Sequence, residues 1–338
     1  MPTASPLLLV FGGGDEDDLV SRAGNRTYVI GSSDLGRLLP NREVIRRLLV
    51  TSEPGHVDLS RYPVIVNMIT EAEKSAKVLN NLKALLIGAP GRVINHPDAV
   101  LRTTRDQVAA LLDGIPGLIV PKTVRLPGDP TMAAESIRSA GLVGPIIVRQ
   151  VGTHTGRTVA LHQSVDDAVA ALEPGQEFIA TQFVDFASPD GNYRKYRVFF
   201  IGNATVLRHM YVSDHWNVHS PDRARFMAPR PDIVAEERAL IERDQPFGLQ
   251  VQQVFREVRA RMPLDFFGLD FGFTPDGAVL LFEANATMSF FPLWRSDDPQ
   301  FQYLTACLRP AQSAFMKLVG QVADTPTVSA QGPGRPVP

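Results

Sequence analysis

The chain alternates short apolar runs, which are typical of buried strands, with longer segments that have a helical period. Residues 7–11 and 63–66 are apolar runs, closed by glycines and by an asparagine respectively. A strand that ends in such a turn is typical of an α/β sheet. Residues 72–86 have a helical pattern, and residues 93–94 predict another short strand. The pattern therefore predicts a small, Rossmann-like α/β domain over residues 1–95.

The pattern changes after residue 95, where strands and helices mix less regularly. We expect helices over residues 103–112, 131–140 and 251–262, and strands over residues 145–149, 158–161, 178–183, 197–201 and 205–211. Ser164 followed by Asp167 predicts a capped helix start. We therefore expect a second domain over residues 96–320, with a central lid at about 120–185. Residues 321–338 are rich in Pro and Gly and predict a disordered tail.

Composition excludes several classes of protein. The chain has 338 residues, with 34 Lys and Arg against 36 Asp and Glu, so its formal net charge is −2. This near-neutral balance argues against nucleic acid as a partner, because binding its phosphate backbone requires excess positive charge. A single cysteine, Cys307, excludes a disulfide framework and a Cys-rich zinc site. No apolar run approaches the roughly 18 residues of a membrane helix. We expect a cytoplasmic protein without a membrane partner.

The most informative segment is a predicted hairpin over residues 267–285. Residues 274–277 read Thr-Pro-Asp-Gly, which suits a tight turn between apolar strands. If these four residues form the loop, Phe273 pairs with Ala278 and Asp270 lies opposite Leu281. Asp270 and Glu283 would then be diagonal neighbours, about 7–8 Å apart on one face.

Asn285 shares that face because side chains in a strand alternate. Two carboxylates and an amide oxygen that converge on an apolar hairpin are the ligands that Mg²⁺ prefers. The sequence therefore predicts a metal site at Asp270, Glu283 and Asn285. The alternative is that these acids lie at solvated strand ends.

Three further segments carry candidate chemistry. The strand over residues 145–149 ends in Arg149 and leads into a loop with Gly152 and Gly156. Backbone N–H groups of such a loop can hold phosphates, although an ordinary glycine turn fits equally well. Lys195 and Arg197 point the same way from one strand and suggest an anion site, or else a solvated edge.

The spacing of His215 and His219 would allow two zinc ligands on a helix. A polar wall beside a substrate and plain hydrogen-bonding histidines are the other interpretations.

Taken in order, these motifs resemble the ATP-grasp superfamily over residues 95–300. The resemblance is greatest to bacterial ATP-grasp domains found beside tetratricopeptide repeats. It rests on Asp-Gly at 190–191, Tyr-Arg-Lys-Tyr-Arg at 193–197, Asp-His-Trp at 214–216 with His219, and Phe-Glu-Ala-Asn-Ala-Thr-Met at 282–288. No tetratricopeptide pattern is visible in this chain. The resemblance implies two α+β subdomains that enclose ATP, preceded by a pre-ATP-grasp domain.

The resemblance also implies roles for individual residues. The nucleotide would be held by Arg105, Arg149, Gly152, Thr153, Thr155, Gly156, Gln182, Phe183, Val184 and Asp185. Mg²⁺, or Mn²⁺, would be bound by Asp270, Glu283 and Asn285. Arg208, Lys195 and Arg197 would act in catalysis. The substrate would contact His209, His215 and Asn217. Asp17, from the acidic run at 15–18, is a further candidate for binding a substrate ammonium group, although that run also suits a solvated loop.

The function implied is that of an ATP-dependent carboxylate–amine ligase. Such an enzyme forms an amide on an amino acid or peptide through an acyl phosphate, and releases ADP and phosphate. Arg105 and Arg149 stand where the superfamily usually has lysines, and Gly268 stands where D-alanine ligases have an arginine. A small-molecule kinase and a non-catalytic nucleotide-binding module remain alternatives. The resemblance also allows a homodimer.

Overall fold

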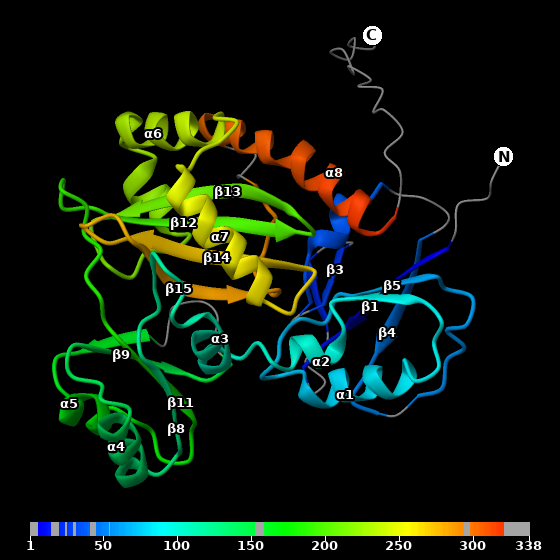
Figure 1. Cartoon of the computed structure of the whole chain (residues 1–338), viewed down its shortest axis with the longest axis horizontal. Helices are drawn as coiled ribbons and strands as arrows, with labels where there is room; N and C mark the ends of the chain where they lie inside the picture. The colour runs from blue at the N-terminus through cyan, green and yellow to red at the C-terminus, as the bar shows by residue number, and fades with distance from the viewer. Residues whose placement is uncertain are drawn as a thin grey trace.

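The computed structural model describes residues 6–14, 20–23, 26–29, 32–40, 45–53, 55–152, 159–293 and 298–320. These residues form three larger β-sheets with helices packed around them, and one small hairpin (Figure 1). The tail predicted over residues 321–338 lies outside the described part of the chain, and the domain boundaries stay a prediction. None of the described helices has the length and apolarity needed to cross a bilayer.

The first sheet is parallel and has the strand order β4-β1-β5-β6. It consists of β1 (Leu7–Gly12), β4 (Ile45–Val50), β5 (Val64–Asn67) and β6 (Arg92–Ile94). Around it lie α1 (Ala76–Leu85), α2 (Pro97–Val100), the 3-10 helix η1 (Leu35–Leu38), and the hairpin of β2 (Val20–Ala23) and β3 (Arg26–Val29).

The apolar pattern predicted β1, β5, β6 and α1, whereas the hairpin of β2 and β3 and the short helices η1 and α2 were not expected from it. The helix expected from residue 72 begins only at Ala76, because residues 71–75 form a turn after β5. Strand β4 was not predicted from the sequence. It is an edge strand in which Arg46, Arg47 and Leu49 are exposed, so its apolar pattern is interrupted.

The second, central sheet is antiparallel and has the order β10-β9-β11-β8. Its strands are β8 (Thr123–Leu126), β9 (Ile146–Gln150), β10 (Val159–His162) and β11 (Phe178–Gln182). Helices α4 (Pro130–Ser139) and α5 (Val165–Ala170) cover one face and enclose a small core of their own. Ser164 accepts a hydrogen bond from the Asp167 N–H at 3.1 Å, which confirms the predicted helix start.

The third sheet has the order β13-β12-β14-β15-β7. Its strands are β7 (Leu118–Ile119), β12 (Tyr193–Ile201), β13 (Ala204–Ser213), β14 (Phe266–Phe273) and β15 (Val279–Asn285). The surrounding helices are α3 (Arg105–Leu112), the π-helix η2 (Arg223–Met227), α6 (Pro231–Ile241), α7 (Leu249–Arg261), the 3-10 helix η3 (Pro299–Cys307) and α8 (Leu308–Leu318). In Figure 1 the central sheet lies below this sheet, and the first sheet lies to one side.

The first and third sheets share one continuous apolar core, whereas the central sheet has a separate one. Asn95 joins the two connected sheets. Its Oδ1 atom accepts from the backbone N–H groups of Asp265 and Phe266 at 2.7 and 3.1 Å, and its Nδ2 atom donates to the Phe266 carbonyl at 2.9 Å. The central sheet is therefore the part of the molecule that is least tied to the rest by apolar packing.

Candidate active site

The hairpin of β14 and β15 forms as predicted, but its register differs. Phe273 pairs with Val279, and a β-bulge at Phe282 shifts the pairing so that Asp270 lies directly opposite Glu283. The expected diagonal arrangement is therefore wrong. A turn sequence fixes the register only up to the first bulge, and the bulge brings the two carboxylates into directly opposed positions.

Asp270 is buried and is held by two cations of β12. Arg197 donates Nε to Oδ1 at 2.6 Å and Nη2 to Oδ2 at 2.8 Å, and the Nζ atom of Lys195 lies 3.6 Å from Oδ2. Burial alone would raise the pKa of Asp270, but Arg197 and Lys195 outweigh burial and lower it below its ordinary value. The carboxylate is therefore ionised. The anion that Lys195 and Arg197 bind in this structure is the Asp270 side chain itself.

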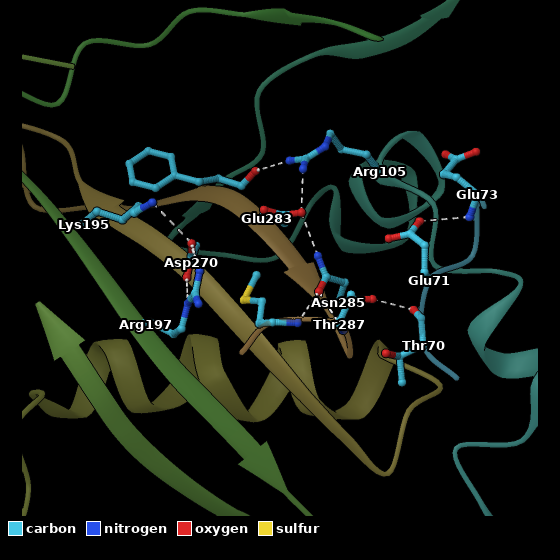
Figure 2. Close-up of polar contacts among 12 residues, drawn as sticks. Thr70, Glu71, Glu73, Arg105, Lys195, Arg197, Asp270, Glu283, Asn285 and Thr287 are labelled. Carbon is cyan, nitrogen blue, oxygen red and sulfur yellow. Dashed lines mark hydrogen bonds and ion pairs between the residues drawn. The ribbon is translucent and has the colours of Figure 1, made fainter. Parts of the chain in front are cut away.

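Glu283 is held in the same way from the other side (Figure 2). Arg105, the first residue of α3, donates Nη2 to Glu283 Oε1 at 2.5 Å, and the Asn285 Nδ2 atom donates to the same oxygen at 2.7 Å. The Asn285 Oδ1 atom accepts from the backbone N–H groups of Thr287 and Met288 at 2.9 and 3.0 Å.

These contacts test the predicted metal site. The carboxylates of Asp270 and Glu283 face each other across the hairpin and line one cavity, so they fit a hard divalent cation. The amide oxygen of Asn285 does not fit, because two backbone donors already use it and the amino group points at Glu283. Its predicted role as a ligand would require the amide to turn.

The cavity between the central and third sheets brings together nine of the twenty predicted site residues. We call it the hinge cavity, and its lining includes Arg105, Arg149, Gln182, Phe183, Val184, Lys195, Trp216, Asn217, Asp270 and Glu283. A second cavity, the N-terminal cavity, shares Arg105, Arg149 and Glu283 with it and extends to residues 70–73 of the first sheet. The two cavities therefore meet at these three charged side chains.

Arg149 is a cation of the site whose side chain lacks an internal hydrogen-bond partner. In the described part of the chain, no hydrogen-bond acceptor or carboxylate pairs with its guanidinium group. Burial, and secondarily the charge of Arg105, lowers the pKa of Arg149 to about 10, so it is still a cation at neutral pH. Arg149 is half-buried in the wall of the two cavities, and a cation held there without a partner is costly, which points to an anionic ligand.

The predicted hinge over residues 182–184 lines the cavity, and an aromatic residue faces it. Trp216 packs edge-on against Phe183, with ring centroids 5.8 Å apart. Gln182 is engaged within the central sheet, because its Nε2 atom donates to the Pro145 carbonyl at 3.0 Å. Asp185 is exposed and accepts from the Ala187 N–H at 3.1 Å, outside both cavities.

Two predicted residues on β13 lie away from both cavities. Arg208 is buried and donates Nε to the Phe290 carbonyl at 2.7 Å and Nη2 to the Pro292 carbonyl at 2.6 Å. His209 is also buried, and its ring stacks on Tyr211 with centroids 3.9 Å apart. Their predicted roles in catalysis and substrate binding stay predictions, which these contacts do not support.

The remaining predicted residues lie at different places in the structure. Gly152 lines the N-terminal cavity, whereas Asp17, Thr153, Thr155 and Gly156 lie outside the described residues. His215 is exposed in a loop that follows β13. That loop is not helical, so the prediction that His215 and His219 could bind zinc from one helix is wrong. Cys307 is buried, as expected of a core residue.

The buried His209 predicts how the free energy of unfolding depends on pH. Burial lowers its pKa well below the ordinary value, and Arg197 and Arg208 lower it further. The unfolded chain therefore binds a proton that the folded chain rejects, and stability is lost as the pH falls below about 6.5. Relative to a His209→Phe variant, we expect the parent to lose about 1.4 kcal/mol in free energy of unfolding for each pH unit below 6.5.

Urea unfolding at pH 7.5 and 5.5 measures this difference. The matched control replaces the exposed His56 with glutamine and should leave the parent's acid sensitivity unchanged. Equal acid sensitivity in the parent and the His209→Phe variant would contradict the prediction.

Several residues of the site were missed in the sequence. Trp216 was noted only as part of a motif, and Thr70, Glu71 and Glu73 were not considered at all. The last three follow β5 and line the N-terminal cavity (Figure 2). Their signal was their place after the carboxyl end of a predicted parallel strand, where α/β proteins bind ligands.

Comparison with known proteins identifies the fold. No protein-family model and no curated protein sequence matches the chain. Among solved structures, the D-Ala:D-Ser ligase VanG from Enterococcus faecalis matches with a TM-score of 0.53 and 11% identity, over 94% of this chain and 99% of that one. D-alanyl-alanine synthetase A from Vibrio cholerae matches with a TM-score of 0.51 and 13% identity, over 92% and 99%.

Carboxyaminoimidazole ribonucleotide synthase from Aspergillus clavatus, complexed with ATP, matches with a TM-score of 0.50 and 16% identity, over 92% of this chain and 79% of that one. At such low identity the similarity concerns the fold and does not transfer an activity. The chain therefore has the ATP-grasp fold.

Proposed function

We propose that this protein is an ATP-dependent carboxylate–amine ligase acting on an amino acid or a short peptide. The observation that carries the proposal is the excess of positive charge around the hinge cavity. Arg105, Arg149, Lys195 and Arg197 are four cations that interact with only two carboxylates, Asp270 and Glu283. Within the described residues Arg149 has no partner of its own. A triphosphate would supply the negative charge that balances this excess.

The lining of the cavity suits the rest of a nucleotide. The segment over residues 182–184 and the ring of Trp216 offer backbone groups and an aromatic surface at one end, and the cations lie at the other. We propose that the nucleobase lies against Phe183 and Trp216, and that Arg149 and Arg105 contact the phosphates. One solved structure with a similar fold, carboxyaminoimidazole ribonucleotide synthase, is a complex with ATP, which supports ATP as the ligand proposed here.

In the proposed reaction a substrate carboxylate oxygen attacks the γ-phosphorus, and the bond to ADP breaks. An amine then attacks the acyl carbon, phosphate leaves and the nitrogen loses a proton. Arg149, Arg105 and Lys195 would neutralise charge on the phosphates, and Gly152 would bring backbone close to them. Mg²⁺ held by Asp270 and Glu283 would supply further charge neutralisation when bound. No side-chain nucleophile is needed, which agrees with the buried position of Cys307.

One observation favours a second candidate, a nucleotide-binding module that works without a metal. Asp270 and Glu283 are already neutralised by Arg197 and Arg105, and the Asn285 amide oxygen is engaged by backbone donors. A protein that only binds the nucleotide could keep these ion pairs intact.

The test is ATP turnover with Mg²⁺ in the presence of a mixed pool of amino acids and short peptides. A ligase releases phosphate only when the pool is present, and mass spectrometry of the mixture identifies the amide. A stable phosphoester instead of free phosphate would indicate a kinase. Calorimetric ATP binding that is unchanged by EDTA, without turnover, would favour the binding module. Absence of ATP binding would exclude all three.

A further inference from the structure

The cavity face of the central sheet carries a row of three side chains that links Arg149 to the rest of the protein. Arg125 on β8 pairs with Ile179 on β11, and Ile179 pairs with Arg149 on β9. Directly opposed residues in antiparallel strands point to the same face. Arg125 and Arg149 therefore lie on one face, separated by a single strand, and move together if the sheet moves.

Arg125 is tied to two elements outside the central sheet. Its Nη2 atom lies 2.6 Å from Glu73 Oε1, in the turn between β5 and α1, and 3.0 Å from Asp106 Oδ1, near the start of α3. A third carboxylate, Glu177, belongs to the central sheet's own loop and lies 3.4 Å from Nη1. The side chains of Arg125, Glu73 and Asp106 are 28%, 20% and 26% exposed, whereas Glu177 is 60% exposed.

The same turn contacts the central sheet at a second point. Gly152 has a φ of +69°, and a Cβ atom placed there would lie 2.6 Å from the Cε atom of Lys74. The side chain of Lys74 therefore packs against Gly152 just beyond the end of β9, which carries Arg149. Glu73 thus contacts the central sheet at Arg125, and Lys74 contacts it just beyond the strand that carries Arg149.

We propose that Arg125 is a positioning residue. Its ion pairs to Glu73 and Asp106 hold the central sheet in the position from which Arg149 reaches the phosphates. The predicted N-terminal domain, which carries Glu73, therefore takes part in nucleotide binding. The inference rests on the proposed nucleotide site. It follows from the separate core of the central sheet, which leaves polar contacts of this kind to fix its position. Without them Arg125 keeps only Glu177, which moves with the sheet.

A distance measurement tests the position directly and does not depend on ATP. Spin labels at Ile87→Cys, beside α1, and Met132→Cys, on α4, report the separation, because these residues are 82% and 58% exposed. The only native cysteine, Cys307, is buried. We expect one narrow distance distribution in the otherwise unaltered chain, and longer, broader ones in Arg125→Gln and Glu73→Gln. The matched control, Glu177→Gln, should keep the narrow distribution.

Nucleotide binding gives the second readout. We expect Arg125→Gln and Glu73→Gln to raise the dissociation constant for ATP about tenfold, as a shifted open–closed equilibrium requires. Turnover of the Arg125→Gln variant at saturating ATP should stay within about twofold, because bound nucleotide draws the central sheet back to the position in which Arg149 contacts it. Arg125→Lys should recover part of the affinity, and circular dichroism confirms folding of each variant.

An unchanged distance distribution in the folded Arg125→Gln variant would overturn the proposal, whatever happens to ATP affinity. If the parent fails to bind ATP but the distributions still shift, the proposed function fails while the mechanical role of Arg125 stands. The proposal would also be overturned if Glu177→Gln weakened ATP binding as much as Glu73→Gln does. The contact between Arg125 and the turn after β5 would then have no special role.

Discussion

Replacing Arg149 with methionine is expected to raise the dissociation constant for ATP by about 10- to 100-fold, the cost of losing a hydrogen bond to a charged group. The same replacement should raise the free energy of unfolding by up to about 1 kcal/mol, because it removes a half-buried charge that has no hydrogen-bonded partner in the described residues and leaves an apolar side chain of similar volume. Opposite effects on binding and stability are the signature of a residue kept for its ligand.

Isothermal titration calorimetry with ATP and urea unfolding of the ligand-free protein measure the two effects. Arg138→Met is the matched control, because Arg138 lies on α4, which packs on the same central sheet, and among the described residues it pairs only with Asp166, with both side chains more than 60% exposed. We expect it to change neither quantity measurably. If Arg149→Met destabilises the protein and leaves ATP affinity intact, Arg149 has a structural role and the phosphate site lies elsewhere.

Replacing Glu237 with alanine is expected to lower the free energy of unfolding by about 3–5 kcal/mol, as breaking a buried ion pair does. Glu237 is fully buried on α6 and accepts both Nη groups of Arg223, at 2.7 and 2.8 Å, the Tyr303 hydroxyl at 2.5 Å and the Met210 N–H at 2.9 Å. The variant leaves three partners on three different elements unsatisfied.

Urea denaturation measures the loss, and the neighbouring Glu236→Ala provides the control. Glu236 is 42% exposed and pairs with Arg194, so its removal should cost less than about 1 kcal/mol. Similar stability losses in the two variants would contradict the view that Glu237 anchors β13, η2 and η3 to α6.

Much of the site could be predicted from the sequence because its chemistry lies in local segments. The turn at residues 274–277 between apolar strands predicts a hairpin, and the hairpin carries Asp270 and Glu283. The strand with Arg149 and the predicted hinge at residues 182–184 are also local patterns. Both line the hinge cavity together with Asp270 and Glu283. Motif order was sufficient to predict the fold, which the structural comparisons confirm.

What the sequence could not show is how these segments meet. The bulge at Phe282 depends on packing across the sheet, and it decides that Asp270 and Glu283 face each other directly. Arg208 looks like a catalytic cation in the sequence, but the fold surrounds it with the carbonyls of residues 290–293.

The sequence by itself determined the α/β character, the hairpin and the set of charged residues, because these follow from local periodicity and turn chemistry. Only the tertiary structure decided which carboxylate pairs with which arginine, which cation is left for a ligand, and that Glu73, in the turn after β5, holds Arg125. These three ion pairs join residues that are far apart in the chain, from 52 positions for Glu73 and Arg125 to 178 for Arg105 and Glu283. Their partners are set by the packing of whole sheets, and a local pattern carries no information about that packing.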